Sequence, residues 1–395
     1  MIEALITSGM LRWARKRSYA TLNAAADKLK VKPEKLNAWE EGYSRPTFRQ
    51  AKDLARKLRI PFGYLYLSEP PEEKLPLPDL RTKLGTRPHE PSPDFLEVLY
   101  DALRKQEWYH DYLKDEQADN VPFVGRFNST SPIKAVAEDV RRVLRIDDCL
   151  GHGAQSKDDF FNRLVQRAEE ARVLVMRSSI VGNNTHRPLD IREFQGFAVV
   201  DNLAPLVFIN TNDFLAAQIF TLVHELAHIW MGIPGVSNLS YLKRSDQHPN
   251  SFERVTDAVA AEALVPADVF DLRWNTSVDI DENLDNLSRH YCVSKFVILR
   301  RAYELKKMEF VVYQSKYSEL GDRTHPTKSK KAGGNTYASV FYRNSSTITS
   351  TLLHSVSEGR MSPKEASQLL NIRALKLYGL ERHLVHREIK EATYA

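Results

Sequence analysis

Residues 221 to 232 read TLVHELAHIWMG, an apolar run that contains two histidines and a glutamate. The run predicts a buried helix, on which His224 and His228 are four residues apart and therefore share one face. Two imidazole nitrogens on one face can bind a single metal ion, and Glu225 is then placed to take a proton from a water molecule beside that ion. The simpler alternative is that both histidines are satisfied within a core.

A third ligand would decide between these interpretations, because catalytic zinc sites take three protein ligands and leave one position for water. A third histidine six residues after His228 is excluded, since that position is Pro234 and Met231 replaces the glycine that such a site needs. The other common solution is a glutamate on a later helix. The segment SFERVTDAVAAEALVP, residues 251 to 266, supplies candidates.

Helical periodicity selects one acid of this segment. Glu253 and Asp257 are four residues apart and share a face, whereas Glu262 points to roughly the opposite side at about 3.6 residues per turn. We therefore predict that Glu253 is the third zinc ligand. Asp257 is expected to accept a hydrogen bond from the far nitrogen of a ligand histidine, and Glu262 to be solvated or held in a salt bridge.

Composition limits the class of protein. The 395 residues are 42% hydrophobic and 27% charged, which is typical of a folded chain long enough for two or three domains. The two cysteines, Cys149 and Cys292, stand far apart, so neither a disulfide framework nor a thiolate metal site is indicated. No apolar run reaches the roughly 18 residues of a membrane span, and no signal peptide is evident. These features predict a cytoplasmic protein.

Positive charge is concentrated near the N-terminus. Residues 1 to 66 contain 14 lysines and arginines against 6 acidic residues, a net charge of +8, so the rest of the chain must sum to −3 for the total of +5. A small basic domain is the electrostatic pattern expected of a nucleic-acid binder. The alternative is an ordinary solvated helical surface.

The metal motif lies in a region that resembles the ImmA/IrrE family of zinc metallopeptidases. The resemblance rests on FTLVHELAH, residues 220 to 228, and ERVTDAVAAEALVP, residues 253 to 266, whose internal spacing matches the family's without a gap. Several positions depart from the family's pattern without removing a ligand: Ala227, Thr256, Asp257 and Val259. The resemblance implies an α+β chain whose zincin-like domain, of the gluzincin type, has a small mixed or antiparallel sheet and a mainly helical C-terminal region.

Near the N-terminus the sequence reads ATLNAAADKLKVKPEKLNAWEEGYSRPT, in which Trp39-Glu40-x-Gly42 ends one predicted helix and Lys30 lies in the turn before it. This segment is similar to Xre-type helix-turn-helix domains, in which that helix is the recognition helix and glycine is common in the turn. The resemblance implies an all-α domain whose residues 33 to 41 enter the major groove. The residues expected nearest to DNA are Lys32, Lys35, Asn37 and Arg45.

Acidic residues on the same helix leave a second interpretation open. Glu34, Glu40 and Glu41 make it locally acidic, so the domain could bind protein instead of DNA.

These patterns together predict five segments. They are a helix-turn-helix domain over 1–68, a proline-rich linker over 69–93, a helical connecting region over 94–157, the zinc metallopeptidase domain over 158–310 and an accessory region over 311–395. Two β-rich runs before the motif helix, GFAVVD and LVFINT, are expected to form neighbouring strands. LVFINT, residues 206 to 211, is further expected to hold an extended substrate by strand addition.

The resemblances imply a zinc-dependent endopeptidase with a DNA-binding domain. Its substrate is expected to be a DNA-binding repressor or other regulatory protein in a stress or mobile-element response. The alternative is a non-catalytic transcription regulator whose metallo-fold senses or binds, although a general base at Glu225 would have no use there. Candidates for stabilising the oxyanion are His248, His290 and Tyr291.

Overall fold

The computed structural model describes residues 3–18, 21–71, 76–77, 91–150, 156–237, 251–323 and 336–394. The chain divides into two compact units, one formed by residues 1–76 with 88–97 and the other by residues 77–87 with 98–395. Most of the predicted linker, residues 72–75 and 78–90, lies outside the described residues. No helix in the described part of the chain combines the length and hydropathy needed to cross a bilayer.

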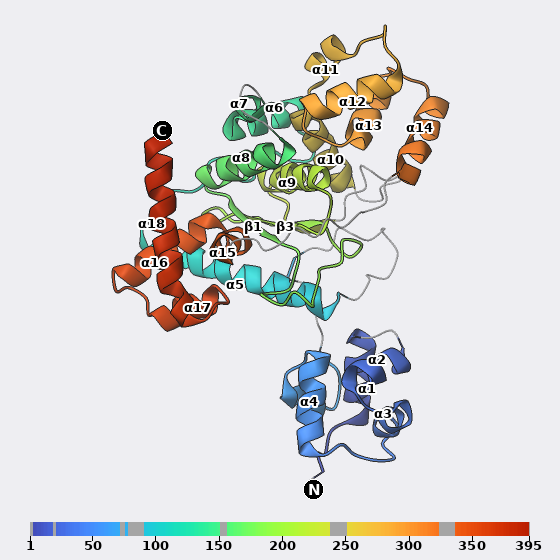
Figure 1. The fold of residues 1–395 in the computed structure, drawn as a ribbon, viewed down its shortest axis with the longest axis vertical. Coiled ribbons are helices and arrows are strands. Elements are labelled where there is room, and N and C mark those ends of the chain that lie inside the picture. The colour runs from blue at the N-terminus through green and yellow to red at the C-terminus, as the bar shows by residue number, and fades with distance from the viewer. Residues whose placement is uncertain are drawn as a thin grey trace. The chain divides into compact units, whose positions relative to one another are not determined.

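The first unit is helical (Figure 1). Its elements are α1 (Ser8–Ser18), α2 (Leu22–Leu29), α3 (Pro33–Glu40), α4 (Phe48–Leu58) and the 3-10 helix η1 (Phe62–Tyr66). Thr21 caps α2 by accepting a hydrogen bond from the Ala24 amide at 3.2 Å, and Thr47 forms a capping box with Gln50 at the start of α4. The helices enclose a core that includes Leu11, Leu36, Trp39, Leu54 and Leu58.

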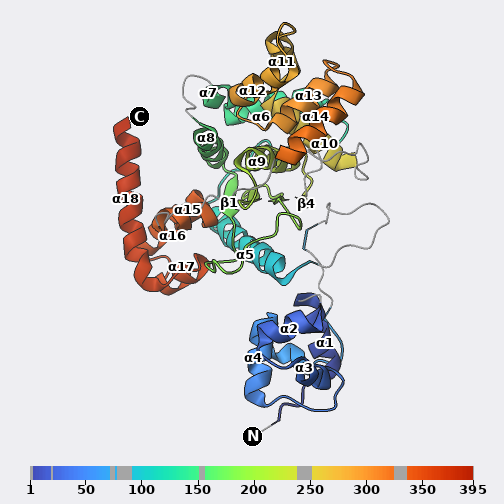
Figure 2. The same ribbon diagram turned by 45° about the vertical axis from the view of Figure 1, so that its right-hand side comes forward.

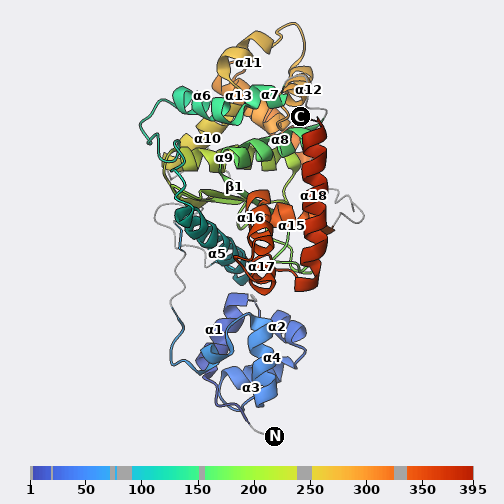
Figure 3. The same ribbon diagram turned by 90° about the vertical axis from the view of Figure 1, so that its left-hand side faces the viewer.

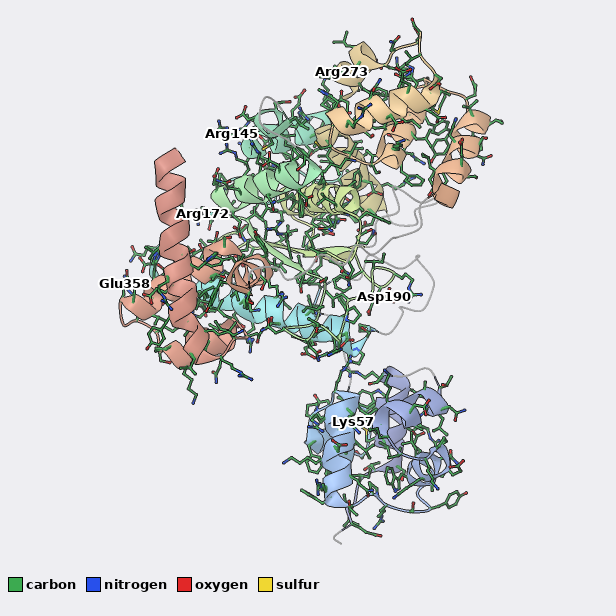
Figure 4. All side chains as sticks on the ribbon, in the orientation of Figure 1. Lys57, Arg145, Arg172, Asp190, Arg273 and Glu358 are labelled. Carbon is green, nitrogen blue, oxygen red and sulfur yellow. The ribbon has the colours of Figure 1, made fainter. Side chains whose placement is uncertain are left out.

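The turn between α2 and α3 is tight. Lys30 ends α2 with φ 57° and ψ 46°, a left-handed conformation that favours glycine, which explains why glycine is common at this position. Lys57, labelled in Figure 4, donates from α4 to the Leu29 carbonyl at 2.7 Å. This contact ties α4 to the end of α2.

The second unit contains a small mixed sheet. Its strands are β1 (Leu174–Ser178), β2 (Gly196–Val199), β3 (Leu206–Asn210) and β4 (Gly235–Ser237), in the spatial order β1-β3-β2-β4. β3 is parallel to β1 and antiparallel to β2, and β2 is antiparallel to β4. The prediction that GFAVVD and LVFINT form neighbouring strands is confirmed, because β2 and β3 pair directly.

Helices make up most of the rest of the second unit. They are α5 (Pro93–Asp115), α6 (Ile133–Leu144), α7 (Ile146–Leu150), α8 (Lys157–Glu170), α9 (Leu215–Trp230), α10 (Ser251–Leu264), α11 (Ala267–Arg273), α12 (Ile280–His290), α13 (Lys295–Glu304), α14 (Phe310–Arg323), α15 (Thr336–Asn344), α16 (Ser346–Ser357), α17 (Pro363–Leu369), η2 (Ala374–Lys376) and α18 (Leu377–Tyr394). α8 and α9 cover one face of the sheet, and α5 lies on the other (Figures 2 and 3). The predicted α+β class, with a mainly helical C-terminal part, is confirmed.

The motif helix α9 lies at the centre of this unit. Its residues from Ala217 to Trp230 are all buried, which accounts for a sequence that is apolar on every side. The sheet lies on one side of α9, and α6, α8 and α10 also contact it. The two histidines and the glutamate of the motif are therefore fixed inside a core.

The prediction that LVFINT holds substrate by strand addition is wrong. β3 lies between β1 and β2 and is hydrogen-bonded to both, so neither of its edges is open to a peptide. Strand addition requires an unpaired edge.

Candidate functional site

Three side chains from α9 and α10 converge at one point. The Nε2 atoms of His224 and His228 lie 3.2 Å apart. The Glu253 carboxylate reaches both, with Oε2 at 3.3 Å from His224 Nε2 and Oε1 at 3.4 Å from His228 Nε2. All three side chains are buried, with exposures of 0%, 0% and 1%. The structure thus brings together the three residues that we predicted as zinc ligands.

These separations fit a tetrahedral zinc site. With zinc bonds of about 2.0–2.1 Å to nitrogen or oxygen, tetrahedral geometry places neighbouring ligand atoms about 3.3–3.4 Å apart. The 3.2 Å between the two Nε2 atoms is close to this spacing, and the Glu253 carboxylate brings Oε2 to 3.3 Å from one imidazole and Oε1 to 3.4 Å from the other. Two histidines and one carboxylate are also the donor set of a catalytic zinc site with one open position. The residues present therefore fit the metal.

Contacts on the far side of each imidazole direct its lone pair toward this point. His228 donates a hydrogen bond from Nδ1 to the Ile233 carbonyl at 3.0 Å. His224 Nδ1 lies 3.0 Å from Asp257 Oδ1, a carboxylate that favours a proton on Nδ1. Nε2 is therefore the atom of each ring that faces the cluster. The structure places Asp257 in the orienting position that the helical spacing predicted.

The electrostatics of the cluster favour a cation. Burial lowers the pKa of His224, but the Asp257 and Glu253 carboxylates outweigh burial and raise this pKa well above its usual value. Burial raises the pKa of Glu253, but the imidazoles of His224 and His228 outweigh burial and hold this pKa well below its usual range. Neither carboxylate oxygen of Glu253 receives a hydrogen bond from the described residues. The site therefore attracts positive charge, as a proton or as a metal ion.

The end of α9 is held by a loop that precedes α6. The Gly125 amide donates to the Ile229 carbonyl and the Phe127 amide to the Trp230 carbonyl, each at 3.0 Å. Gly232 follows the helix with φ +67°, and the Ile233 amide returns to the His228 carbonyl at 3.0 Å. Carbonyl groups at the end of a helix need hydrogen-bond donors such as these. Here the same hydrogen bonds also fix the backbone that orients His228.

The remaining motif residues take different positions. Glu225 lies beside His224 on α9 and is fully buried. Glu262 points away from the cluster, where it pairs with Arg301 of α13 and accepts the Ala267 amide at 3.2 Å, as expected of the acid on the opposite face.

Sequence reasoning missed Gly196, on β2, whose backbone lies directly against Glu225. A glycine that opens a β-rich run is a signal of close approach, and it could have identified this residue.

The role of the three candidates for stabilising an oxyanion stays a prediction. His248 lies outside the described residues. Tyr291 is buried at the end of α12, where burial raises its pKa and nearby Arg273 and Arg141 partly offset that effect. Burial lowers the pKa of the neighbouring His290, and Arg273 lowers it further.

The predicted DNA-contacting residues lie on one stretch of the first unit. Lys35 and Asn37 lie on α3, Lys32 directly precedes this helix, and Arg45 follows it. All four side chains are exposed. The Lys35 ammonium stands over the Trp39 ring, 5.3 Å from its centre, in a cation–π contact that orients this exposed side chain.

The acids of α3 are largely neutralised by α1. Glu40 is buried against Arg15, with distances of 2.7 and 3.0 Å between its two oxygens and the guanidinium. Glu41 pairs with Arg12 at 2.7 Å. Glu34 remains exposed among the lysines. The acidity that the sequence suggested for this helix is therefore mostly internal charge pairing.

Comparison with known proteins agrees with both halves of this description. Residues 168–303 match the peptidase family model of the IrrE N-terminal-like domain, and residues 11–65 match the helix-turn-helix model. Searches of curated proteins and of solved structures found no match to the chain. The two family matches confirm both resemblances and their order. Within the chain, a region that matches the helix-turn-helix model is thus followed by a region that matches the model of the IrrE N-terminal-like peptidase family.

Proposed function

We propose that this protein is a zinc-dependent endopeptidase in which His224, His228 and Glu253 hold the metal. The observation that carries the proposal is the convergence of these three buried side chains at 3.2, 3.3 and 3.4 Å. A zinc ion, when bound, supplies Lewis acidity that lowers the pKa of a water molecule toward ~7 and polarises a peptide carbonyl.

The protein residues supply binding, orientation and proton transfer. Glu225 is the general base, which takes a proton from the attacking water and delivers it to the leaving amine. Asp257 and the Ile233 carbonyl orient the two imidazoles so that Nε2 of each ring faces the position of the metal. A protein that only sensed or bound would need the three ligands but not a buried carboxylate beside them. This difference favours an enzyme over a non-catalytic regulator.

We further propose that the first unit binds DNA through α3 and that the substrate is a DNA-binding repressor or another regulatory protein. The exposed Lys32, Lys35, Asn37 and Arg45 support DNA binding, as does the pairing of Glu40 and Glu41 with α1. Binding near the same DNA raises the effective concentration of a substrate without new contacts at the active site. A tether of this kind would supply selectivity.

DNA binding should depend on salt and on the exposed lysines. Lys35→Ala should weaken binding of genomic fragments and reduce the slope of log K against log salt by about 1 for a lost phosphate contact. Arg56→Ala is the matched control, because Arg56 is exposed on α4 and already paired with Asp53. Electrophoretic shifts over a salt series would measure both. Failure of the wild type to shift any fragment at low salt would favour a protein-binding role for this unit.

Cleavage should depend on that DNA binding. In the native host, N-terminal labelling of the proteome should reveal a regulatory protein that is cut in the presence of the wild-type chain but not in a deletion strain. The Lys32→Ala/Lys35→Ala variant should cut this target more slowly, because the tether is weakened while the metal site is unchanged. Equal cleavage by the variant would contradict the tether, and the absence of any cut protein would count against the peptidase itself.

A further inference from the structure

The carboxylate of Glu225 lies against the backbone of β2 at a position without a side chain. A Cβ atom added to Gly196 would lie 2.7 Å from Glu225 Oε1 and 3.0 Å from Glu225 Cγ. It would also lie 2.8 Å from Cγ2 of Thr221, one turn earlier on α9. Carbon atoms in proteins do not approach this closely, so any side chain at this position would displace something.

Backbone conformation does not explain this glycine. Gly196 is not among the residues with positive φ, so an L-residue could adopt its conformation. Glycine within a strand weakens the sheet, and its presence there is a sign of close approach by another group. Here the approaching group is Glu225. Glycine is therefore needed at position 196 because any larger residue would occupy the space that the Glu225 side chain fills.

The other neighbours of Gly196 are held in place. Gly196 is paired with Ile209 of β3 on one side and with Ser237 of β4 on the other, so the strand cannot easily move away. Thr221 is fully buried, and its hydroxyl donates to the Ala217 carbonyl at 2.9 Å, which fixes the methyl group that faces the strand. The Glu225 side chain, with its long stem, can yield, whereas the Thr221 methyl would still meet the new Cβ at 2.8 Å.

We propose that Gly196 is a positioning residue, whose missing side chain forms the slot that holds the Glu225 carboxylate beside the metal centre. This inference rests on the proposed role of Glu225 as general base. Gly196 itself touches no reacting atom. It acts by fixing where the carboxylate can lie, and a displacement of about 1 Å at a catalytic group can cost on the order of 100-fold in rate.

The test uses the full-length protein loaded with Co²⁺ in place of zinc. The visible spectrum of Co²⁺ reports its surroundings and needs no substrate. The Gly196→Ala protein should keep about one metal ion per chain, because no ligand is touched, and its absorption bands should shift from the wild-type positions toward those of Glu225→Gln. Turnover of a target protein found by N-terminal labelling should fall about 100-fold. Gly321→Ala is the matched control, since a Cβ there meets no atom within 4 Å.

A double variant separates positioning from general damage. The comparison is made in a Thr221→Ser background, which removes the methyl carbon that a new Cβ would meet at 2.8 Å. In that background Glu225→Ala empties the slot, so the double variant Gly196→Ala/Glu225→Ala should have the same spectrum as Glu225→Ala alone. If the Gly196→Ala protein loses metal or unfolds, the double variant identifies the cause. Recovery of metal binding and of folding in the double variant would assign the clash to the Glu225 side chain. The absence of such recovery would overturn the proposal. A folded, metal-loaded Gly196→Ala protein with the wild-type spectrum would also overturn it. These spectra stand even if the wild type cleaves nothing, so failure of the proposed peptidase is distinguishable.

Discussion

The Glu225→Gln protein should retain its zinc and lose about 10²- to 10⁴-fold in peptidase turnover, the range that general acid–base catalysis contributes. Glutamine has nearly the shape of glutamate, so the buried slot beside Gly196 stays filled and the three ligands are undisturbed. What is lost is the ability to accept a proton. Metal analysis and cleavage of the target protein, measured on the same preparation, check both halves of this expectation.

The comparison with wild type also separates the two classes of function. In a regulator that only binds metal, replacing glutamate by glutamine at position 225 would change neither the metal content nor the function of the protein. Equal turnover of the two proteins on a shared target would contradict the assignment of Glu225, whereas loss of zinc from Glu225→Gln would show that this side chain supports the ligands. Melting temperature serves as the control for folding.

Glu253→Ala should remove most of the zinc. Orienting residues outside the ligand set cost 10- to 100-fold in metal affinity, so loss of a direct ligand should cost more than about 100-fold. It would also leave His224 without one of the two carboxylates that raise its pKa. Competition with a chromophoric chelator measures the affinity. Full retention of zinc would remove Glu253 from the ligand set.

Glu262→Ala is the matched control for this experiment. Glu262 lies on the same helix and is paired with the largely buried Arg301, so its loss should lower the free energy of unfolding by about 2 kcal/mol. Zinc affinity should stay at the wild-type value, because Glu262 points away from the cluster. A variant that is destabilised but binds zinc normally would show that the Glu253 effect is not general damage to α10.

The arrangement of the metal cluster could be predicted because it depends on local periodicity. His224 and His228 share a face of α9, and Glu253 and Asp257 share a face of α10, for the same reason of four-residue spacing. Once both helices are buried in one core, the matching faces meet. The cap at Thr21 and the left-handed turn at Lys30 belong to the same class of local signals.

Features that depend on distant pairing could not be predicted in this way. LVFINT has the composition of a strand, but whether a strand lies at an edge or in the interior depends on its partners, here β1 and β2. The charge of α3 likewise depends on Arg12 and Arg15, which precede their acidic partners by 29 and 25 residues. The slot at Gly196 exists only because α9 packs across β2.

The central claim is that one zinc ion is held between His224, His228 and Glu253, and X-ray diffraction at the zinc absorption edge tests it most directly. Crystals of the protein purified with zinc should show a single anomalous peak per chain at the metal centre, about 2.0–2.1 Å from Nε2 of each histidine and about 2.0–2.2 Å from the Glu253 carboxylate. A peak bound by other residues, or none at these three side chains in zinc-loaded protein, would contradict the account.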